Sequence, residues 1–383
     1  MQCRLAGKKR LVGKAFNKKV SAILFRGNMN TKTTAVALIV TLVIGIVVGI
    51  AAAPMVTTSV IGGVTPGMTS AISQLKVGLI LPITPEDYSW NYQADYSIKL
   101  IQKQFGFQLT TAENLFDGTK AEPVATDWAS KGYNVIIGQG IQYQDMFNKI
   151  APQFPKTVFV CVDCFAGTGN VYNVWWYMAD AAYLMGLLAG KMTHTNKIGL
   201  IGGGKAMSIW AGHEAFKRGV RQVNKAATFQ EAWMAFSWAD VAGAKKAGEQ
   251  MADQGVDFIF SSGDGIDVGV RQVAQEKNIQ MTGVYADAAH LDPAHIAQSM
   301  VVRWDIAYLT AIFDYVRGDY NNKWLQADLF AGMVSLGAFG SAVPQDVQTY
   351  LTAQQSSLRM GVALPFTLDS TCFDKPDQPQ CKV

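Results

Sequence analysis

The chain has 383 residues, of which 49% are hydrophobic and 16% are charged. This composition excludes an intrinsically disordered protein and supplies enough apolar residues for a large core. The net charge is +4 at pH 7, but nine of the 33 Lys and Arg residues fall in residues 1–53, where no acidic residue occurs. The remainder carries 24 basic against 29 acidic residues. It is therefore mildly acidic, which excludes binding of nucleic acid through a general positive surface.

The N-terminal region has the pattern of a membrane anchor. Residues 1–34 form a basic leader, and residues 35–53 form a run of 19 residues without a charge. As a helix this run would be about 28 Å long, close to the thickness of the hydrocarbon core of a bilayer. The basic leader places its own side in the cytoplasm. We predict an uncleaved transmembrane helix that holds a globular domain on the extracytoplasmic side of the cell membrane.

Two alternatives concern the same region. The small residues Ala51, Ala52 and Ala53 are typical of a signal-peptidase site, so a cleaved signal is the second interpretation. A start at Met29 would give a more ordinary signal sequence and make residues 1–28 a misassigned upstream extension.

Residues 54–75 are small, polar-leaning and uncharged, and we expect a spacer there. Beyond them, short apolar runs alternate with longer amphipathic stretches, which predicts parallel sheets covered by helices on both faces. Strands are expected at 76–81, 107–111, 134–138, 157–162, 197–201, 227–232, 257–261, 280–285 and 297–302. Helices are expected at 92–105, 176–192, 211–223, 241–254 and 267–277.

An internal repeat divides this part of the chain. KVGLI at 76–80 returns as KIGLI at 197–201, and KGYNVII at 131–137 returns as QGVDFIF at 254–260. Two matches at nearly the same offset predict two similar α/β lobes, and convergence on a common strand–helix pattern is the alternative. We assign residues 76–175 and about 303–371 to lobe one with its hinge-returning segments, 176–302 to lobe two, and 372–383 to a polar tail.

The repeat also places two tryptophans at equivalent positions. Trp90 lies 14 residues after Lys76, and Trp210 lies 13 residues after Lys197. Both follow the first strand of their lobe, and ligands of open α/β sheets bind at the carboxyl ends of strands. We expect the two indoles to hold a planar ring between the lobes. Ordinary packing of aromatic side chains is the alternative.

The cysteines fit an exported protein. Cys161 and Cys164 form an isolated CxxC, for which a local disulfide or two plain thiols are favoured over a redox site. Cys372 and Cys381 flank a short polar segment and can pair in an oxidising compartment.

A first glycine-rich motif suggests nucleotide chemistry but lacks a necessary part. The segment 199–205 fits GxxxxGK, yet Ala206 stands where a phosphate loop needs the Ser or Thr that binds Mg²⁺. We interpret its three consecutive glycines as a tight strand-to-helix turn beside a ligand.

A second motif begins at Gly263, opens a predicted helix and is followed by Asp287 near the end of the next strand. This spacing resembles a dinucleotide-binding fingerprint. However, Asp264 and Asp267 put negative charge where a pyrophosphate would lie. The favoured interpretation is a neutral ligand bound by backbone N–H groups and Asp264.

Catalytic motifs are otherwise missing from the sequence. It contains neither GxSxG nor HExxH, and its four His show no metal-ligand spacing. We expect no enzyme activity, no cofactor and no metal. A nicotinamide-dependent oxidoreductase is the enzyme alternative.

These segments, in their order and spacing, resemble the basic membrane protein (Bmp) family. Its members are substrate-binding components of ABC importers, and several bind purine nucleosides. The resemblance covers about residues 76–370 and rests on KVGLI, on SWN at 89–91 where the family has SFN, and on KGYNVIIGQG at 131–140. It continues through 158–163, 183–193, 197–203, 216–220, 253–257, 283–287 and 299–305.

The resemblance implies a type I periplasmic-binding-protein fold, in which two doubly wound parallel-sheet lobes are joined by a hinge; here a transmembrane helix would precede it. By position, Trp90 would replace the stacking Phe of the family and Asn91 would hydrogen-bond the base. Asp163 and Asp287 would accept hydrogen bonds from the ligand, and Gly263 would allow close backbone approach.

The chain also departs from the family. Val302, beside Arg303, takes the place of the Lys that contacts ribose in nucleoside binders. A free nucleobase or another flat heterocycle is therefore a possible ligand beside a nucleoside. The candidate ligand-binding residues are Trp90, Asn91, Asp163, Trp210, Gly263, Asp264, Asp287 and Arg303.

The expected function is that of an extracytoplasmic solute-binding protein, whose partners would be the permease and ATPase subunits of an ABC importer. The alternative from another class is a ligand-sensing receptor of the same fold that feeds a signalling partner.

Overall fold

The structure of the protein is a computed structural model that describes residues 65–374. Among these residues no helix is long and apolar enough to cross a membrane. The basic leader, the anchor or signal expected at 35–53, and most of the expected spacer lie outside the described residues.

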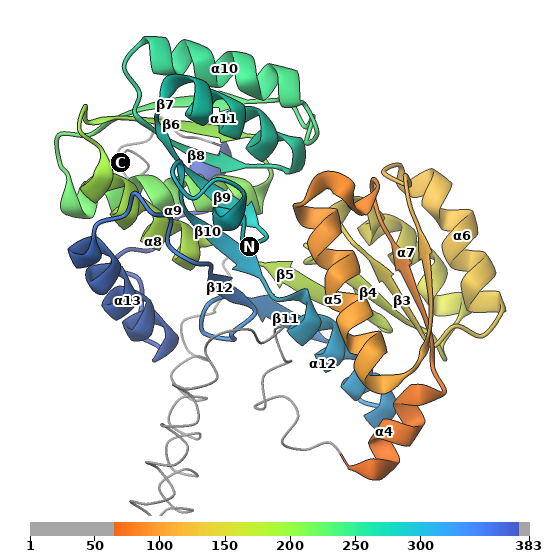
Figure 1. The fold of residues 1–383 in the computed structure, drawn as a ribbon. Coiled ribbons are helices and arrows are strands. Elements are labelled where there is room, and N and C mark those ends of the chain that lie inside the picture. The colour runs from red at the N-terminus through yellow and green to blue at the C-terminus, as the bar shows by residue number, and fades with distance from the viewer. Residues whose placement is uncertain (1–64, 375–383) are drawn as a thin grey trace, which may run out of the picture. The chain divides into compact units, whose positions relative to one another are not determined.

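Lobe one contains a six-stranded parallel sheet in the order β11-β5-β4-β3-β1-β2 (Figure 1). Its strands are β1 (Lys76–Ile80), β2 (Gln108–Ala112), β3 (Val135–Gly138), β4 (Val158–Val162), β5 (Val171–Trp176) and β11 (Trp324–Ala327). Helices α4 (Pro66–Ser73), α5 (Trp90–Phe105) and α12 (Trp304–Arg317) pack together on one face, and α6 (Gly118–Ser130) and α7 (Gln144–Ile150) cover the other. The apolar central strands are buried because helices lie on both faces.

Lobe two repeats this design in the order β12-β10-β9-β8-β6-β7. Its strands are β6 (Lys197–Gly202), β7 (Thr228–Trp233), β8 (Phe258–Ser262), β9 (Gln280–Tyr285), β10 (Ile296–Val302) and β12 (Val334–Leu336), of which β12 is antiparallel to β10. Helices α8 (Ala179–Met192), α9 (Met207–Val223) and α13 (Gln345–Arg359) form one layer, and α10 (Val241–Asp253) and α11 (Asp264–Lys277) form the other (Figure 1). Short helical turns are η1 (Pro85–Asp87), η2 (Ile141–Tyr143), η3 (Ala151–Gln153), η4 (Ala289–Leu291) and α14 (Thr371–Asp374).

The two sheets match strand for strand, so the prediction of two similar α/β lobes is confirmed. The repeated strands β1 and β6 hold equivalent places, as do β3 and β8. The glycine that both copies of the second repeat share, Gly132 and Gly255, is explained by the local backbone conformation. Gly132 after α6 and Gly255 after α10 have φ angles of +77° and +91°, a left-handed conformation that glycine adopts most readily at the end of a helix.

The chain passes between the two sheets three times. It leaves sheet one between β5 and α8, returns between β10 and α12, and crosses again between β11 and β12. The carboxyl ends of the strands in both sheets therefore lie near these three connections, where a ligand site is expected.

Three segments differ from the sequence-based assignment. Residues 66–73, expected in the spacer, form α4, which packs on α5 and α12 and buries Ile72 completely. The helix predicted from residue 176 begins at Ala179 instead, because Trp176 ends the β-branched and aromatic strand β5. In the segment assigned to lobe one after residue 303, α13 packs on α8 of lobe two.

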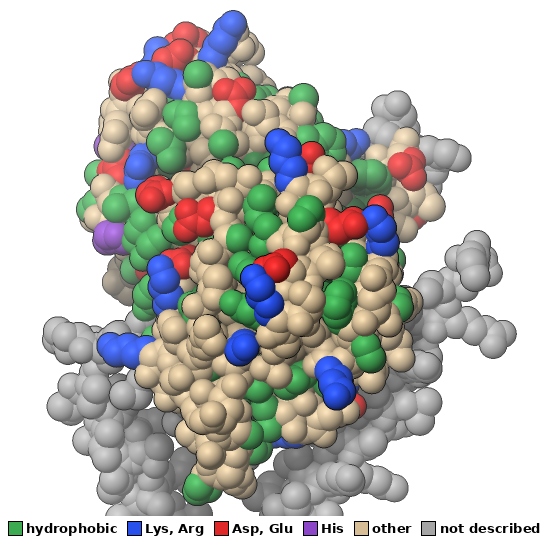
Figure 2. Space-filling model, turned by 90° about the vertical axis from the view of Figure 1, so that its right-hand side faces the viewer, with side chains coloured by type: hydrophobic (Ala, Val, Ile, Leu, Met, Phe, Trp, Pro, Cys, Tyr) green, Lys and Arg blue, Asp and Glu red, His purple; other side chains and the backbone are tan. Residues whose placement is uncertain are grey.

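Helices α6 and α7 carry surface charges in pairs. On the face drawn in Figure 2, acidic and basic side chains are interspersed. Lys131 pairs with Asp127 at 2.8 Å and Lys149 with Glu122 at 2.7 Å. Such a face presents no large field of one sign.

Candidate functional site

A pocket of about 70 Å³ lies between the two lobes. From lobe one it is lined by Pro82, Trp90, Phe116, Gln139, Gly140, Ile141, Gln142, Asp163 and Trp176; from lobe two by Ile209, Trp238, Asp264 and Tyr285. Most of these residues follow the carboxyl end of a strand or begin the next helix. This is the edge at which the sequence predicted a ligand site.

Trp90 forms a fixed aromatic wall of the pocket. Its ring centroid lies 5.0 Å from those of Tyr285 and Trp304, both edge to face, and 6.4 Å from that of Trp176. Its indole N–H donates to the carbonyl of Gln139 at 3.1 Å. Edge-to-face packing and this hydrogen bond hold the indole in one orientation, so that it can offer a flat surface to a ligand.

Asp163 follows β4 and reaches the pocket from lobe one. Its Oδ2 accepts a hydrogen bond from the hydroxyl of Ser208, on α9 of lobe two, at 3.0 Å. Its Oδ1 is buried and has no hydrogen-bond partner among residues 65–374. Burial raises the pKa of this carboxyl to about 7, although the Ser208 hydrogen bond opposes the shift. Asp163 thus presents an unused acceptor beside the pocket.

Asp264 reaches the pocket from lobe two, at the start of α11. Burial, and then the nearby carboxyls of Asp87 and Asp267, raise its pKa well above the usual range. Asp267 lies one turn further and is held by the hydroxyl of Ser261 and by the N–H of Val284, the latter at 2.9 Å. Burial raises the pKa of Asp267 to about 7.

This arrangement is suited to a ligand with N–H or O–H donors. An ionised carboxylate accepts such bonds, and a protonated one can donate to a ring nitrogen. None of the described residues that line the pocket is Lys, Arg or His. A phosphate or carboxylate group on the ligand would therefore meet acidic side chains without a compensating cation.

Asn91 lies next to the pocket but does not line it. Its backbone N–H and its Nδ2 both donate to Oδ2 of Asp87, at 2.9 Å and 2.8 Å. Its own Oδ1 is buried and finds no partner within the described part of the chain. In this structure Asn91 orients Asp87 at the start of α5.

Three other predicted residues also lie outside the pocket lining. Asp287 accepts a hydrogen bond from the N–H of Ala338 at 3.0 Å. Arg303 forms two hydrogen bonds with Asp305, at 2.8 Å and 2.6 Å, so its charge is already compensated. Gly263 precedes α11, where a Cβ would lie 2.6 Å from Ile266, which explains the need for glycine at this turn.

The expected pairing of Trp90 with Trp210 across the gap is wrong. Trp210 is 5% exposed and packs edge to face on Phe373, with 5.7 Å between ring centroids, beside the buried Cys372. Its neighbour Ile209 lines the pocket instead. Consecutive residues of a helix point about 100° apart, so an offset of one residue in the repeat turns the indole away.

Sequence reasoning named three of the thirteen lining residues, and the ten that it missed include Gln139, Trp176, Trp238 and Tyr285. Gln139 directly follows β3 and Tyr285 ends β9, so the rule of carboxyl strand ends would have found both. Trp176 was missed because the sequence analysis assigned it to a helix, whereas it ends strand β5. Trp238 lies in the loop after β7 and carries no signal in the sequence.

Both cysteine predictions can be placed. Cys161 and Cys164 form a disulfide, one of the two states that the sequence favoured. Cys372 is disulfide-bonded as well, and Cys381 lies outside the described residues.

A chain of hydrogen bonds behind the pocket has the order of a Ser–His–acid triad. Nε2 of His213 lies 2.8 Å from Oγ of Ser262, and Nδ1 lies 2.7 Å from Glu231. Both Ser262 and His213 are completely buried and neither lines the pocket. Burial lowers the pKa of His213, so a neutral imidazole links β7, β8 and α9 here.

Two further contacts close the lobes over the pocket. The hydroxyl of Tyr88, in lobe one, lies 3.0 Å from Nε2 of His290, in lobe two. The bond between Ser208 and Asp163 crosses the same gap. Both bonds would have to break for the lobes to separate.

Comparisons with known proteins agree with this geometry. Residues 74–365 match the family model described as "ABC transporter substrate-binding protein PnrA-like". A purine-binding protein of Brucella abortus is 27% identical over 317 residues, which cover 82% of this chain and 89% of that protein. The transcriptional activator protein med of Bacillus subtilis is 25% identical over 274 residues, covering 71% and 85%.

The fold is also that of solved solute-binding proteins. The structure of an ABC transporter solute-binding protein from Conexibacter woesei superimposes with a TM-score of 0.64 at 23% identity. The match covers 76% of this chain and 98% of that protein. The likeness supports the two-lobe α/β fold.

Proposed function

Because the chain belongs to the PnrA-like (Bmp) family of ABC transporter substrate-binding proteins, a family of binding proteins and not of enzymes, we propose that it is the solute-binding component of an ABC importer. Its ligand is a small planar molecule such as a purine nucleoside or nucleobase, bound between the two lobes. The observation that carries this proposal is the pocket, in which aromatic rings and the carboxyls of Asp163 and Asp264 converge from both lobes.

The chemistry of the pocket supports a purine. A purine ring combines flat faces with N–H donors and ring nitrogens, and stacking of a base on an aromatic side chain contributes about 1–3 kcal/mol. The buried acceptor of Asp163 adds specificity, because an analogue without the matching donor would leave it unpaired. The purine-binding relative from Brucella abortus points to the same class of ligand.

A titration of intrinsic tryptophan fluorescence tests this proposal. The full chain, purified in detergent, is titrated with adenosine, guanosine, adenine and guanine, and with AMP and NADH as controls. We expect saturable changes with at least one nucleoside or base and none with AMP, because the lining offers no cation for a phosphate. Saturation by the dinucleotide alone would reverse the assignment in favour of an oxidoreductase.

We further propose that the folded domain lies on the extracytoplasmic side of the cell membrane, held by residues 35–53. The Cys161–Cys164 disulfide supports this location, since disulfides persist mainly in oxidising compartments. Protease treatment of intact cells should degrade the domain if this topology is right. N-terminal sequencing of the mature protein distinguishes an uncleaved anchor from a cleaved signal.

A ligand-sensing protein that feeds a regulatory partner is the second candidate. The similarity to the transcriptional activator med favours it. Deletion of the gene distinguishes the two: loss of uptake of a radiolabelled purine supports transport, whereas unchanged uptake with altered transcription supports sensing.

A further inference from the structure

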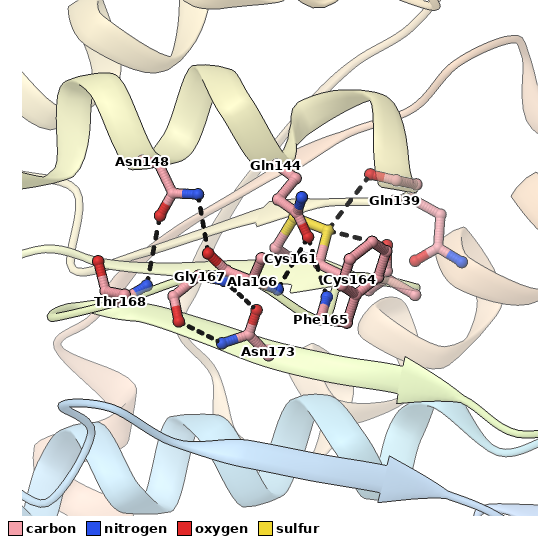
Figure 3. The surroundings of a disulfide bond; sticks show 12 residues. Gln139, Gln144, Asn148, Cys161, Cys164, Phe165, Ala166, Gly167, Thr168 and Asn173 are labelled. Atoms are coloured by element: carbon pink, nitrogen blue, oxygen red, sulfur yellow. Dashed lines mark hydrogen bonds between the residues drawn. A yellow bond between two sulfur atoms is a disulfide. The ribbon is translucent and has the colours of Figure 1, made fainter. Parts of the chain in front are cut away.

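A covalent loop encloses the pocket carboxylate of lobe one. Cys161 is the fourth residue of β4, Cys164 directly follows Asp163, and their disulfide closes a loop of four residues (Figure 3). Both cysteines are completely buried. Asp163, which lines the pocket, therefore lies inside this covalent ring.

The backbone beyond this ring is held by three amide side chains (Figure 3). Oε1 of Gln144 accepts from the N–H groups of Phe165 and Ala166, both at 3.0 Å. Asn148 bonds Ala166 and Thr168, and Asn173 bonds both backbone groups of Gly167. Because the chain is fixed from residue 164 onward, the disulfide connects Asp163 to a rigid support on each side.

Asp163 has a conformation that needs such support. Its φ angle is +59°, the left-handed region that costs a non-glycine residue about 1–2 kcal/mol. Within the backbone, its N–H donates to the carbonyl of Val174 at 2.7 Å. A relaxation of φ would rotate the carboxyl away from the pocket and from Ser208.

Lobe two has a left-handed residue at the equivalent strand end without a covalent ring. Tyr285 ends β9 with a φ angle of +70°. There the N–H of the preceding Val284 is held by the carboxylate of Asp267 at 2.9 Å. Each lobe thus places one pocket residue in the left-handed backbone conformation. In lobe one a disulfide supports it, and in lobe two a hydrogen bond does.

We propose that the Cys161–Cys164 disulfide is a positioning element of the ligand site, which fixes the carboxylate of Asp163 toward the pocket. This proposal rests on the proposed function, because it assigns to the disulfide an effect on the affinity for the ligand. The disulfide affects the affinity by positioning Asp163, so its effect requires the carboxylate of Asp163.

A double-mutant cycle tests that dependence. Dissociation constants are measured for adenosine and adenine with the wild-type chain, C161A/C164A, D163N and the triple variant. We expect C161A/C164A to weaken binding about tenfold in the wild-type background and less than about twofold in the D163N background. Equal weakening in both backgrounds would mean that the disulfide acts through general stability, and the proposal would fall.

Cys372, which is also disulfide-bonded, supplies the matched control. Cys372→Ala removes this disulfide next to Trp210, outside the pocket. We expect this variant to bind the probes like the wild type, even where its thermal stability is lower. A tenfold loss of affinity in Cys372→Ala as well would contradict a specific role for Cys161–Cys164.

Hydrogen–deuterium exchange gives a readout that needs no ligand. The amide of Asp163, in the peptide 158–166, should exchange faster in C161A/C164A than in the wild type, while 258–264 at the end of β8 stays unchanged. If no probe binds but this difference is present, the proposed function is at fault and the positioning role stands. Unchanged exchange at 158–166 overturns the inference.

If C161A/C164A does not fold, reduction of the Cys372→Ala chain by dithiothreitol replaces it. The dithiol supplies two electrons and two protons, the disulfide becomes two thiols, and the reagent closes to its own cyclic disulfide. No atom larger than hydrogen is added, so no cavity forms. The same faster exchange and the same tenfold loss of affinity are expected.

Discussion

Buried carboxyls, Asp264 among them, affect how the stability of the folded protein depends on pH. Burial raises the pKa of Asp163, Asp180 and Asp267 to about 7. A carboxyl whose pKa is higher in the folded than in the unfolded state binds more protons when folded. Its contribution to stability is complete below the unfolded pKa of about 4 and is lost as the pH rises through about 7.

Asp163→Asn removes one carboxyl that binds a proton in the folded state. We expect the free energy of unfolding to fall less between about pH 5 and about pH 8 in this variant, by roughly 1–2 kcal/mol, because a neutral amide needs no proton. Urea unfolding at the two pH values measures the difference. Asp346→Asn, on the exposed start of α13, is the control that should follow the wild type, and parallel pH profiles for all three proteins would refute the expectation.

The two tryptophans of the repeat allow a direct comparison. Trp90→Ala should weaken adenine binding by roughly 10-fold to 100-fold, because it removes a stacking surface worth about 1–3 kcal/mol. Trp210→Ala removes an equally buried indole outside the pocket and should leave the affinity within about twofold. Isothermal titration calorimetry measures both, and equal losses would show that the effect is one of folding.

The sequence predicted where site residues lie along the chain. It did not predict the direction in which their side chains point. The rule that ligands bind at carboxyl strand ends selected Trp90, the glycine motif selected Asp264 and the family resemblance selected Asp163, and all three line the pocket. The resemblance also selected Asp287, whose carboxylate binds the backbone of Ala338 instead. Direction depends on partners that are distant in the sequence, such as Phe373 for Trp210.

At the scale of elements, hydrophobic pattern predicted nine of the twelve described strands. The strands β11 and β12 were missed because each is short and lies at a sheet edge, where burial leaves little pattern. The strand β5 was missed because its aromatic residues run directly into the apolar helix α8. The helix α4 was missed because its first residues are Pro and Gly, although Thr65 caps it at 3.3 Å.

The repeated turns before β3 and β8 make a prediction at this scale. Gly132→Ala and Gly255→Ala should each lower the free energy of unfolding by about 1–2 kcal/mol, because alanine is strained at their positive φ angles. The two losses should be similar, since both glycines end a helix before an equivalent strand. Urea unfolding at pH 7 compares them.

Gly67→Ala is the matched control for this pair. Gly67 lies in the first turn of α4, where a Cβ would lie 3.9 Å from the side chain of Thr65. Alanine favours a helix there, so stability should stay equal or rise by up to about 1 kcal/mol. A loss at Gly67 as large as at Gly132 would argue against the left-handed turn as the cause.

For the whole molecule, the proposed binding would be a shift between separated and closed lobes. A ligand stabilises the closed state only through contacts that it makes with both lobes at once, and Trp90 with Asp163 on one side and Asp264 with Tyr285 on the other are placed for this. The bond between Tyr88 and His290 adds to the closed state without any ligand.

Tyr88→Phe should therefore make closure less favourable. We expect the dissociation constant for adenine to rise by roughly 2-fold to 10-fold, as for the loss of one hydrogen bond, and the radius of gyration of the free protein to increase in small-angle X-ray scattering. Tyr133→Phe loses a hydroxyl that bonds Thr110 within lobe one and should change neither quantity. If neither the dissociation constant nor the radius of gyration changed in Tyr88→Phe, this bond would not contribute to closure.

The three connections between the sheets also govern what a single cut in the chain can do. A protease that cleaves one of them, for example between β5 and α8, leaves the lobes joined by the two other covalent connections. The fragments would separate on a denaturing gel but elute together in size-exclusion chromatography under native conditions. A nicked molecule of this kind keeps both halves of its ligand site at a high effective concentration, which a two-domain protein with a single linker cannot do.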